Sequence, residues 1–403
     1  MGERLVPFDS LLSYPLRSGV TVAKASRGSG IRMVNMRELF KYPRLGDVDM
    51  ARVRIDTTDE ERFLLRKGDL LFARRSLTAE GAGKCSLIVF DQEATTWESS
   101  IIRARLDSNI AQPEYYYYFF SSSVGRRSIE TIIEQVAAAG IRSSDLAKLM
   151  VPLPSKTEQR AVAAVLGALD DKIAINNQIG ATQEQLFRAR FQELQIDVEP
   201  ESQSTIAVSE LIEFNPRLPA PSSMEAAYLE MSAVPTGAAR VQGWSRREPR
   251  SGTRFSNGDT VMARITPCLE NGKVAFIDFM SEGEVGVGST EFIVMRARAG
   301  FPTHLSYFLA RSPRFQENAI RNMVGSSGRQ RVGAAQLVDF PVSRPDMDEL
   351  SIFGKDSSVA FDHMKALDAE SNVLMQLRDT LLPGLMSGEI RVRDAETTVG
   401  DVT

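Results

Sequence analysis

Residues 65–74, LRKGDLLFAR, decide the fold of this chain, because the pattern returns at residues 254–264 as RFSNGDTVMAR. In each copy a Gly-Asp turn leads into a short apolar stretch that ends in arginine. Further landmarks recur in the same order: Gly83-Lys84 as Gly272-Lys273, Pro113 with Tyr118-Phe119 as Pro302 with Tyr307-Phe308, Arg142 as Arg331, and residues 151–154 as residues 340–343. A repeat of this length predicts one fold present twice, not a solenoid of short repeats.

The bulk composition bounds the class of protein. A length of 403 residues predicts two or three domains, and 43% hydrophobic with 25% charged residues is typical of a globular chain. No apolar run approaches the roughly 20 residues that span a bilayer, and the N-terminus lacks the apolar core of a signal peptide, so we expect a cytoplasmic protein. Two cysteines at non-equivalent places and two isolated histidines predict neither a disulfide framework nor a zinc site.

The charge balance points in two directions. A net charge of −4 argues against indiscriminate coating of nucleic acid, but it leaves room for a local basic face. Of the 48 basic residues, 38 are arginine and 10 are lysine. This bias fits a GC-rich coding sequence, and it equally fits the use of guanidinium groups on base edges and phosphates. Composition alone does not separate the two interpretations.

Each copy predicts an α/β (α+β) domain. Extended stretches are punctuated by Gly-Asp and Gly-Lys turns, and helical stretches follow them. We expect helices over residues 113–122 and 125–139 in the first copy, and over 305–310 and 313–323 in the second. The first domain comprises residues 1–153 and the second comprises residues 201–344.

A long helix is predicted after each domain. Residues 154–200 hold the first helix and a linker, with an apolar stripe at heptad-like spacing. The polar pair Asn176-Asn177 and the helix-weakening Gly180 leave open whether this helix is unbroken. Residues 345–388 hold the second helix, which follows a/d spacing more closely and is expected to stop at Pro383-Gly384. Two helices in equivalent positions predict an antiparallel coiled-coil pair that acts as a spacer in a pseudo-twofold molecule. Residues 389–403 form the tail, expected to be disordered from Ala395.

Three stretches carry a resemblance to a known family. Residues 152–160, PLPSKTEQR, followed by residues 166–173, LGALDDKI, are similar to the helix start of the specificity subunits of type I restriction-modification enzymes. Residues 377–392, LRDTLLPGLMSGEIRV, resemble the second signature of that family. The resemblance covers nearly the whole chain in the order domain, helix, domain, helix. It fails at one place, because the second helix begins with DMDEL at residues 346–350 and lacks the Glu-Gln-Arg start.

The resemblance implies a non-catalytic DNA sequence-specificity subunit. Each domain would be a target-recognition domain for one half of a bipartite site in double-stranded DNA. The helices would set the spacer and dock two methyltransferase subunits, and motor-nuclease subunits would complete the restriction complex. S-adenosylmethionine, ATP and Mg²⁺ would belong to those partners, and this chain would hold no cofactor. Two alternatives stay open: the specificity subunit of a type IIB-like enzyme, whose partner fuses methylation and cleavage, and a coiled-coil scaffold that does not bind DNA.

Motifs that resemble catalytic sites are incomplete. Residues 80–85, EGAGKC, resemble a phosphate-binding loop, but Thr78 and Cys85 stand where a Walker A motif needs glycine and serine or threonine. Residues 214–217, FNPR, lack the second proline and the aromatic residue of an amino-methyltransferase motif. Pro345-Asp346 is not followed by the Glu-x-Lys of a nuclease site. We therefore expect no catalytic activity in this chain.

Basic residues beside strand ends and turns are the candidate DNA contacts. Arginine and glutamine bind guanine and adenine edges in a bidentate manner, and glycine-rich loops let the backbone approach phosphate. Any single one of these residues can equally be a solvated surface charge, and their recurrence in both copies is what favours DNA binding by the group. The predicted DNA-binding residues are Arg74, Arg75, Lys84 and Arg142 in the first domain, and Arg246, Arg247, Arg264, Lys273, Arg329, Gln330 and Arg331 in the second.

Overall fold

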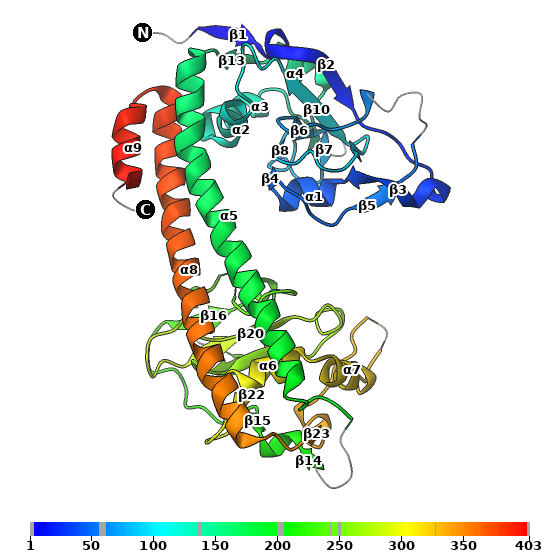
Figure 1. Ribbon diagram of the computed structural model, residues 1–403, viewed down its shortest axis with the longest axis vertical. Coiled ribbons are helices and arrows are strands. Elements are labelled where there is room, and N and C mark those ends of the chain that lie inside the picture. Colours follow the sequence, from blue (N-terminus) through cyan, green and yellow to red (C-terminus); the bar gives the residue numbers. More distant parts are fainter. Residues whose placement is uncertain are drawn as a thin grey trace. The chain divides into compact units, whose positions relative to one another are not determined.

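The computed structural model divides into two compact units (Figure 1). It describes residues 4–55, 62–135, 139–199, 205–241, 243–248, 251–326 and 328–400. Unit 1 comprises Met1–Ala174 and Ser371–Thr403, and unit 2 comprises Ile175–Glu370. Two long helices, α5 (Lys156–Glu193) and α8 (Met347–Ser387), each contribute one end to either unit. Each unit is therefore a globular domain with part of both helices packed on it.

Unit 1 contains two principal sheets. The five-stranded sheet has the order β2 (Leu12–Ser18), β10 (Ile101–Leu106), β6 (Leu70–Ala73), β8 (Cys85–Ile88), β4 (Arg44–Leu45). The three-stranded sheet has the order β5 (Ala51–Val53), β3 (Arg27–Val34), β9 (Thr95–Trp97), with β3 and β9 parallel. Smaller pairings join β1 (Leu5–Pro7) to β13 (Met150–Pro152), and β12 (Ala139–Gly140) to both β11 (Glu134–Gln135) and β7 (Arg75–Ser76).

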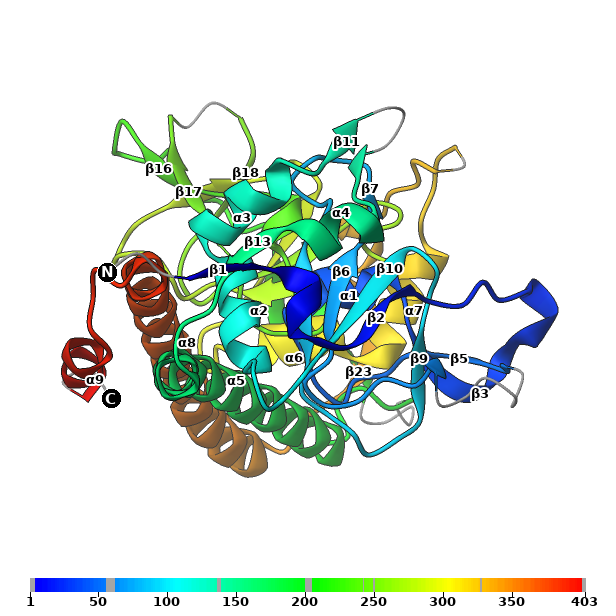
Figure 2. The same ribbon diagram turned by 90° about the horizontal axis from the view of Figure 1, so that it is seen from above.

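Short helices pack on both faces of the larger sheet in unit 1 (Figure 2), because Leu70 and Phe72 of β6 lie in one apolar cluster and Leu71 and Ala73 lie in another. They are α1 (Met36–Lys41), α2 (Pro113–Ser121), α3 (Ser123–Glu130) and α4 (Ser143–Lys148), with 3-10 turns at Phe8–Leu11 and Lys24–Ser26. The helix predicted over residues 113–122 is confirmed as α2, which begins at a proline suited to the first helical position. The helix predicted over residues 125–139 was too long. Helix α3 ends at Glu130, and Glu134–Gln135 pair as strand β11.

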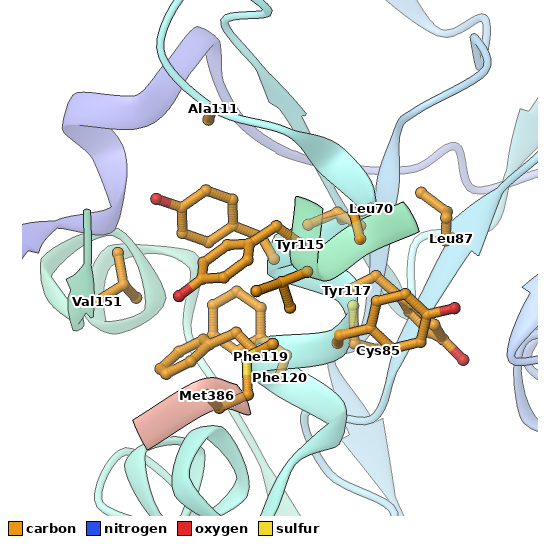
Figure 3. Packing of buried hydrophobic residues seen from close by; sticks show 14 of the residues in the cluster. Leu70, Cys85, Leu87, Ala111, Tyr115, Tyr117, Phe119, Phe120, Val151 and Met386 are labelled. Atoms are coloured by element: carbon orange, nitrogen blue, oxygen red, sulfur yellow. The ribbon is translucent and has the colours of Figure 1, made fainter. Parts of the chain in front are cut away.

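Helix α2 forms the centre of the unit 1 core. Its six residues from Tyr115 to Phe120 are all buried. Figure 3 shows the rings of Tyr115, Tyr117, Phe119 and Phe120 packed among strand residues and Met386 of α8. A helix that is apolar on all sides must be covered on all sides, so α2 joins the sheet to the long helices of its unit.

Unit 2 repeats this architecture. One sheet has the order β15 (Ile212–Phe214), β22 (Phe292–Ala297), β19 (Thr260–Ala263), β20 (Val274–Phe276), and the other has the order β17 (Ser245–Arg247), β16 (Ala226–Leu229), β21 (Gly286–Gly288), β18 (Thr253–Phe255). Strand β14 (Thr205–Ala207) pairs with β23 (Pro341–Ser343). The predicted helices are present as α6 (Leu305–Arg311) and α7 (Pro313–Arg321), and 3-10 turns lie at Val208–Glu210, Met231–Ala233 and Ala334–Gln336.

The repeated Gly-Asp turn is held by the same contacts in both units. Asp69, which is fully buried, accepts hydrogen bonds from the backbone amide of Arg66 at 2.8 Å and from two nitrogens of Arg105 at 2.7 Å. Asp259 accepts from the amide of Ser256 at 2.7 Å and from Arg296 at 2.6 and 2.8 Å. We call each of these the Asp–Arg lock. The predicted duplication of an α/β domain is therefore confirmed down to individual hydrogen bonds.

Helix α5 is continuous through Asn176 and Gly180, which answers the question that the sequence left open. Within unit 2 it contacts α8 through Asn176 with Glu370, Gln183 with His363, and Arg190 with Asp356. The partners advance by seven residues on α5 and retreat by seven on α8, which is the signature of an antiparallel coiled coil. Asn176 is 2% exposed and lies between the two helices. The polar residue that interrupts the apolar stripe of α5 is therefore paired with Glu370 of α8.

The C-terminal region differs from the prediction in two ways. Helix α8 does not stop at Pro383-Gly384 but continues to Ser387. The tail is helical and not disordered, because α9 (Val392–Gly400) forms there. The backbone amide of Ile390 donates to the carbonyl of Gly384 at 3.0 Å, and Ala395 is fully buried in the unit 1 core. These contacts hold in place a segment that the sequence predicted to be disordered. No helix in the described ranges combines the length and the apolarity that a bilayer span requires.

Candidate nucleic-acid interface

The predicted arginines of unit 1 gather around the end of strand β6. Arg74 follows β6 and is partly buried, with Nη1 3.5 Å from the carbonyl of Ser99. Arg75 is exposed in β7, opposite Gly140 of β12. Arg142 follows β12 and pairs with Glu134 at 2.8 Å while remaining 67% exposed. We call this group the unit 1 strand-end cluster.

The unit 2 strand-end cluster lies at the matching place. Arg264 follows β19, and Arg331 faces Ile265 in an antiparallel bridge. The carbonyl of Gln330 accepts from the amide of Thr266 at 3.1 Å, and Arg329 precedes it on the exposed surface. One further member, Glu291, was not among the predicted residues. It lies just before β22 and receives hydrogen bonds from Arg331 at 2.7 and 2.9 Å. These bonds lower the pKa of the Glu291 carboxyl.

The hydrogen-bond register corrects one predicted correspondence. The amide of Ile141 donates to the carbonyl of Arg74 at 3.0 Å, as the amide of Val332 donates to that of Arg264 at 3.0 Å. Ile141 is thus equivalent to Val332, so Arg331 occupies the position of Gly140 and not that of Arg142. The prediction that Arg142 returns as Arg331 was wrong by two residues. Side-chain likeness suggested that match, whereas backbone pairing fixes the true register.

The two repeated lysines make the same structural contact. The Nζ of Lys84 donates to the carbonyl of Phe40 at 3.1 Å, and the Nζ of Lys273 donates to the carbonyl of Met231 at 2.6 Å. Each ammonium holds a neighbouring segment against its sheet. This contact accounts for the recurrence of the two lysines without DNA, and their role in DNA binding stays a prediction.

Arg246 and Arg247 lie apart from the strand-end cluster, on the edge strand β17. Arg246 pairs with Glu284 at 2.9 Å and lies 5.4 Å from the ring centroid of Trp244, and Arg247 pairs with Glu230. The matching edge strand of unit 1 is β5, which carries the exposed Arg52 and is followed by the exposed Arg54, and neither was among the predicted DNA contacts. The signal was present, since the run ARVR at residues 51–54 alternates arginine with apolar residues as a half-buried strand does.

Within the described ranges, the cysteines and the buried histidine do not form a metal site. No group of three His, Cys, Asp or Glu side chains in the described residues is arranged to hold a metal ion. Cys85 and Cys268 are both free, and burial raises the pKa of the Cys85 thiol. His304 is buried between Phe276 and Phe361, with ring centroids 4.5 and 4.2 Å away, and burial lowers its pKa to about 4.

Comparison with known proteins finds a family model and relatives that match part of this chain. Residues 36–185 match the model of the type I restriction modification DNA specificity domain. The type I restriction enzyme EcoEI specificity subunit of Escherichia coli is 30% identical over 199 residues, which are 45% of this chain and 33% of that protein. The EcoAI specificity subunit of Escherichia coli is 29% identical over 157 residues, 37% of this chain and 26% of that protein. The matches thus span about a third of the length of these relatives.

A solved structure has a similar fold over 96% of the chain. The S subunit of a type I restriction-modification system from M. genitalium aligns over 96% of both chains with a TM-score of 0.56, at 16% sequence identity. Residues 36–185 thus match a type I restriction modification DNA specificity domain, and unit 2 repeats the fold of unit 1. The resemblance to specificity subunits seen in the sequence is confirmed.

Proposed function

We propose that this chain is the DNA sequence-specificity subunit of a type I restriction-modification complex. The observation that carries the proposal is the pairing of one repeated scaffold with two different strand-end clusters. The scaffold of unit 1 matches a DNA specificity domain, and unit 2 keeps its Asp–Arg lock while presenting Arg264, Glu291 and Arg331 where unit 1 has Arg74, Ser100 and Gly140. Two strand-end clusters with different side chains would recognise different bases, as a bipartite, asymmetric site in double-stranded DNA requires.

The long helices support a role in assembly. Apolar side chains remain exposed along both of them: Ile175 (52%) and Leu186 (55%) on α5, and Ile352 (58%), Val359 (70%) and Val373 (51%) on α8. Exposed apolar residues repeated along a helix pair are typical of a surface that another protein covers. We propose that two methyltransferase subunits dock there, that the helix lengths set the unread spacer, and that motor-nuclease subunits complete the complex. Adenosylmethionine, ATP and Mg²⁺ would be held by these partners, and this chain would position DNA without catalysing a reaction.

DNA binding by the full chain, with and without the methyltransferase subunits, tests this function. We expect weak binding by the chain alone, because its net charge is −4, and tight sequence-selective binding by the complex. Affinity should fall steeply with salt, since phosphate contacts release counterions. Arg74→Ala should relax selection in one half-site only and Arg264→Ala in the other, each by roughly 1–3 kcal/mol if it contacts a base.

A scaffold without DNA contacts makes the opposite prediction. The complex would then assemble normally, bind duplex with little dependence on salt, and be unaffected by loss of either arginine. Glu317→Ala provides a matched control, because Glu317 is 64% exposed on α7 and pairs only locally with Arg321 at 3.2 Å. Assembly with methyltransferase but no selection among DNA sequences would contradict the proposed function.

A further inference from the structure

Glu291 is an unexpected residue in a predicted DNA-reading cluster, because its negative charge faces the negative charge of DNA. The carboxylate lies between Arg331, at 2.7 Å, and Arg264, at 4.0 Å. Glu291 is 25% exposed, Arg264 is 32% exposed and Arg331 is 40% exposed. The three side chains are therefore half-buried and ordered by one another, unlike a solvated surface pair.

The backbone around Glu291 is fixed as well. The amide of Arg264 donates to the carbonyl of Glu291 at 2.9 Å, and the amide of Glu291 donates to the hydroxyl of Ser289 at 3.2 Å. Arg331 is held on both sides, because its amide and carbonyl pair with Val324 at 2.9 Å and it bridges to Ile265. Both partners of the ion pair are thus held by backbone hydrogen bonds, Glu291 in the turn just before β22 and Arg331 in isolated β-bridges, and such fixed backbone positions a side chain more precisely than a free loop does.

Counting the N–H groups of Arg331 shows what remains for a ligand. A guanidinium carries five N–H groups, one on Nε and two on each terminal nitrogen. Nε and one N–H of Nη2 donate to Glu291, and one N–H of Nη1 donates to the carbonyl of Arg329 at 3.3 Å. In the part of the chain that the structure describes, these contacts leave one N–H on Nη1 and one on Nη2. Two such N–H groups on adjacent nitrogens match the O6 and N7 acceptors of guanine in the major groove.

We propose that Glu291 is a specificity-determining positioning residue, which holds Arg331 so that its free Nη1 and Nη2 N–H groups bind O6 and N7 of one guanine in the half-site read by unit 2. This inference rests on the proposed function and adds the base and the residue that orients its reader. The carboxylate contributes in a second way, because it repels backbone phosphates and so disfavours a phosphate contact by Arg331. Unit 1 has Gly140 and Ser100 at the equivalent positions, so this guanine contact belongs to one half-site only.

Selection of bound duplexes from a library randomised in both half-sites tests the inference. The complex of the full chain with its methyltransferase subunits is used as wild type and as the variants Glu291→Gln, Arg331→Lys and Glu317→Gln. The last is the matched control, because Glu317 also pairs with an arginine of unit 2, Arg321, but lies on helix α7 and is 64% exposed. Affinity for an unrelated duplex is measured in parallel at several salt concentrations.

We expect the wild type to require guanine at one position of one half-site. Glu291→Gln should reduce that preference about tenfold, while affinity for unrelated duplex stays the same or rises. Arg331→Lys should lose the preference as well, since an ammonium cannot make the paired contact, but should keep the salt dependence. Glu317→Gln should change neither property. Every variant should select the other half-site and the remaining positions of the unit 2 half-site as the wild type does, which shows that both units are folded.

Three results would overturn the inference. Glu291→Gln could keep the full guanine preference, or weaken binding to all sequences equally, as a purely structural residue would. The position that responds to Arg331→Lys could also select a base other than guanine. In each case the wild type still selects a bipartite site, and the proposed function stands. A wild-type complex that selects no sequence at all would overturn the proposed function and this inference together.

Discussion

The same strand position is filled by a charge in unit 1 and by an apolar residue in unit 2. Arg103 of β10 faces Leu71 in the ladder, as Val294 of β22 faces Val261. Arg103 is 3% exposed, with its guanidinium carbon 5.1 Å from the ring centroid of Trp97, and burial together with nearby arginines lowers its pKa to about 10. Val294 lies in an apolar cluster and is fully buried. Main-chain pairing and the Asp–Arg lock are therefore the same in both units, whereas the buried side chains between the sheets differ.

Exchanging these two residues should give the largest effect and an unequal one. Val294→Arg places a charge in a cluster that offers it no partner, and we expect a loss of about 4 kcal/mol in the free energy of unfolding of unit 2. Arg103→Val removes a buried charge and should be neutral or stabilising for unit 1, because the cost of burying the charge is removed with it. Each unit contains one tryptophan, Trp97 or Trp244, so urea unfolding followed by fluorescence in a Trp97→Phe or a Trp244→Phe background reports one unit at a time. Equal losses from both exchanges would mean that the two interiors are equivalent after all.

The Asp–Arg locks should differ in strength although their geometry is the same. Asp69→Ala leaves Arg105, which is 12% exposed, without its carboxylate, and we expect a loss of about 4 kcal/mol in unit 1. Asp259→Ala leaves Arg296, which is 31% exposed and closer to water, so a loss of about 2 kcal/mol is expected in unit 2. The same single-tryptophan unfolding measurement compares them. A larger loss for Asp259→Ala would show that solvent exposure of the arginine does not set the strength of the lock.

Low pH should destabilise unit 2 by a route that unit 1 lacks, because both histidines of the chain lie in unit 2. The folded-state pKa of His304, about 4, lies below its ordinary value of 6.5, so the unfolded chain takes up the proton first. Neutral His304 therefore contributes to the free energy of unfolding. This contribution is complete above pH 6.5 and is lost as the pH falls toward 4, by up to about 3 kcal/mol, since each pKa unit corresponds to about 1.36 kcal/mol. His304→Phe keeps an aromatic ring against Phe276 and Phe361 and should remove this loss between pH 6.5 and 4. An unchanged acid profile in His304→Phe would assign the loss to carboxylates.

The sequence predicted the order of elements well because the deciding patterns are local. Gly68 and Gly258 adopt φ of 89° and 90°, a conformation that favours glycine, and so each Gly-Asp turn is visible in a single short stretch. Heptad spacing likewise predicted α5 and α8 and their antiparallel pairing. The same local reasoning failed at the tail, since α9 depends on burial of Ala395 in a distant core.

The candidate site was predicted only in part. Recurrence in both copies was taken as a sign of DNA contact, but the residues that recur most faithfully, Lys84 with Lys273 and Asp69 with Asp259, hold the scaffold. At the strand ends, by contrast, only Arg74 and Arg264 recur, whereas Ser100 and Gly140 are replaced by Glu291 and Arg331. Glu291 carried no signal in the sequence, because its place beside Arg331 depends on pairing between segments 40 residues apart.

The sequence by itself determined that this chain is a duplicated α/β domain joined to two heptad helices, since turns, helix periodicity and repeat order are properties of neighbouring residues. Only the tertiary structure decided which side chains share a site. A change of one residue in strand register moves every side chain of the strand to a new position. The observed register makes Arg331 the counterpart of Gly140 and places it in contact with Glu291. Register is fixed by hydrogen bonds between distant segments and by burial of one face of each strand, and neither can be read from a single stretch of sequence.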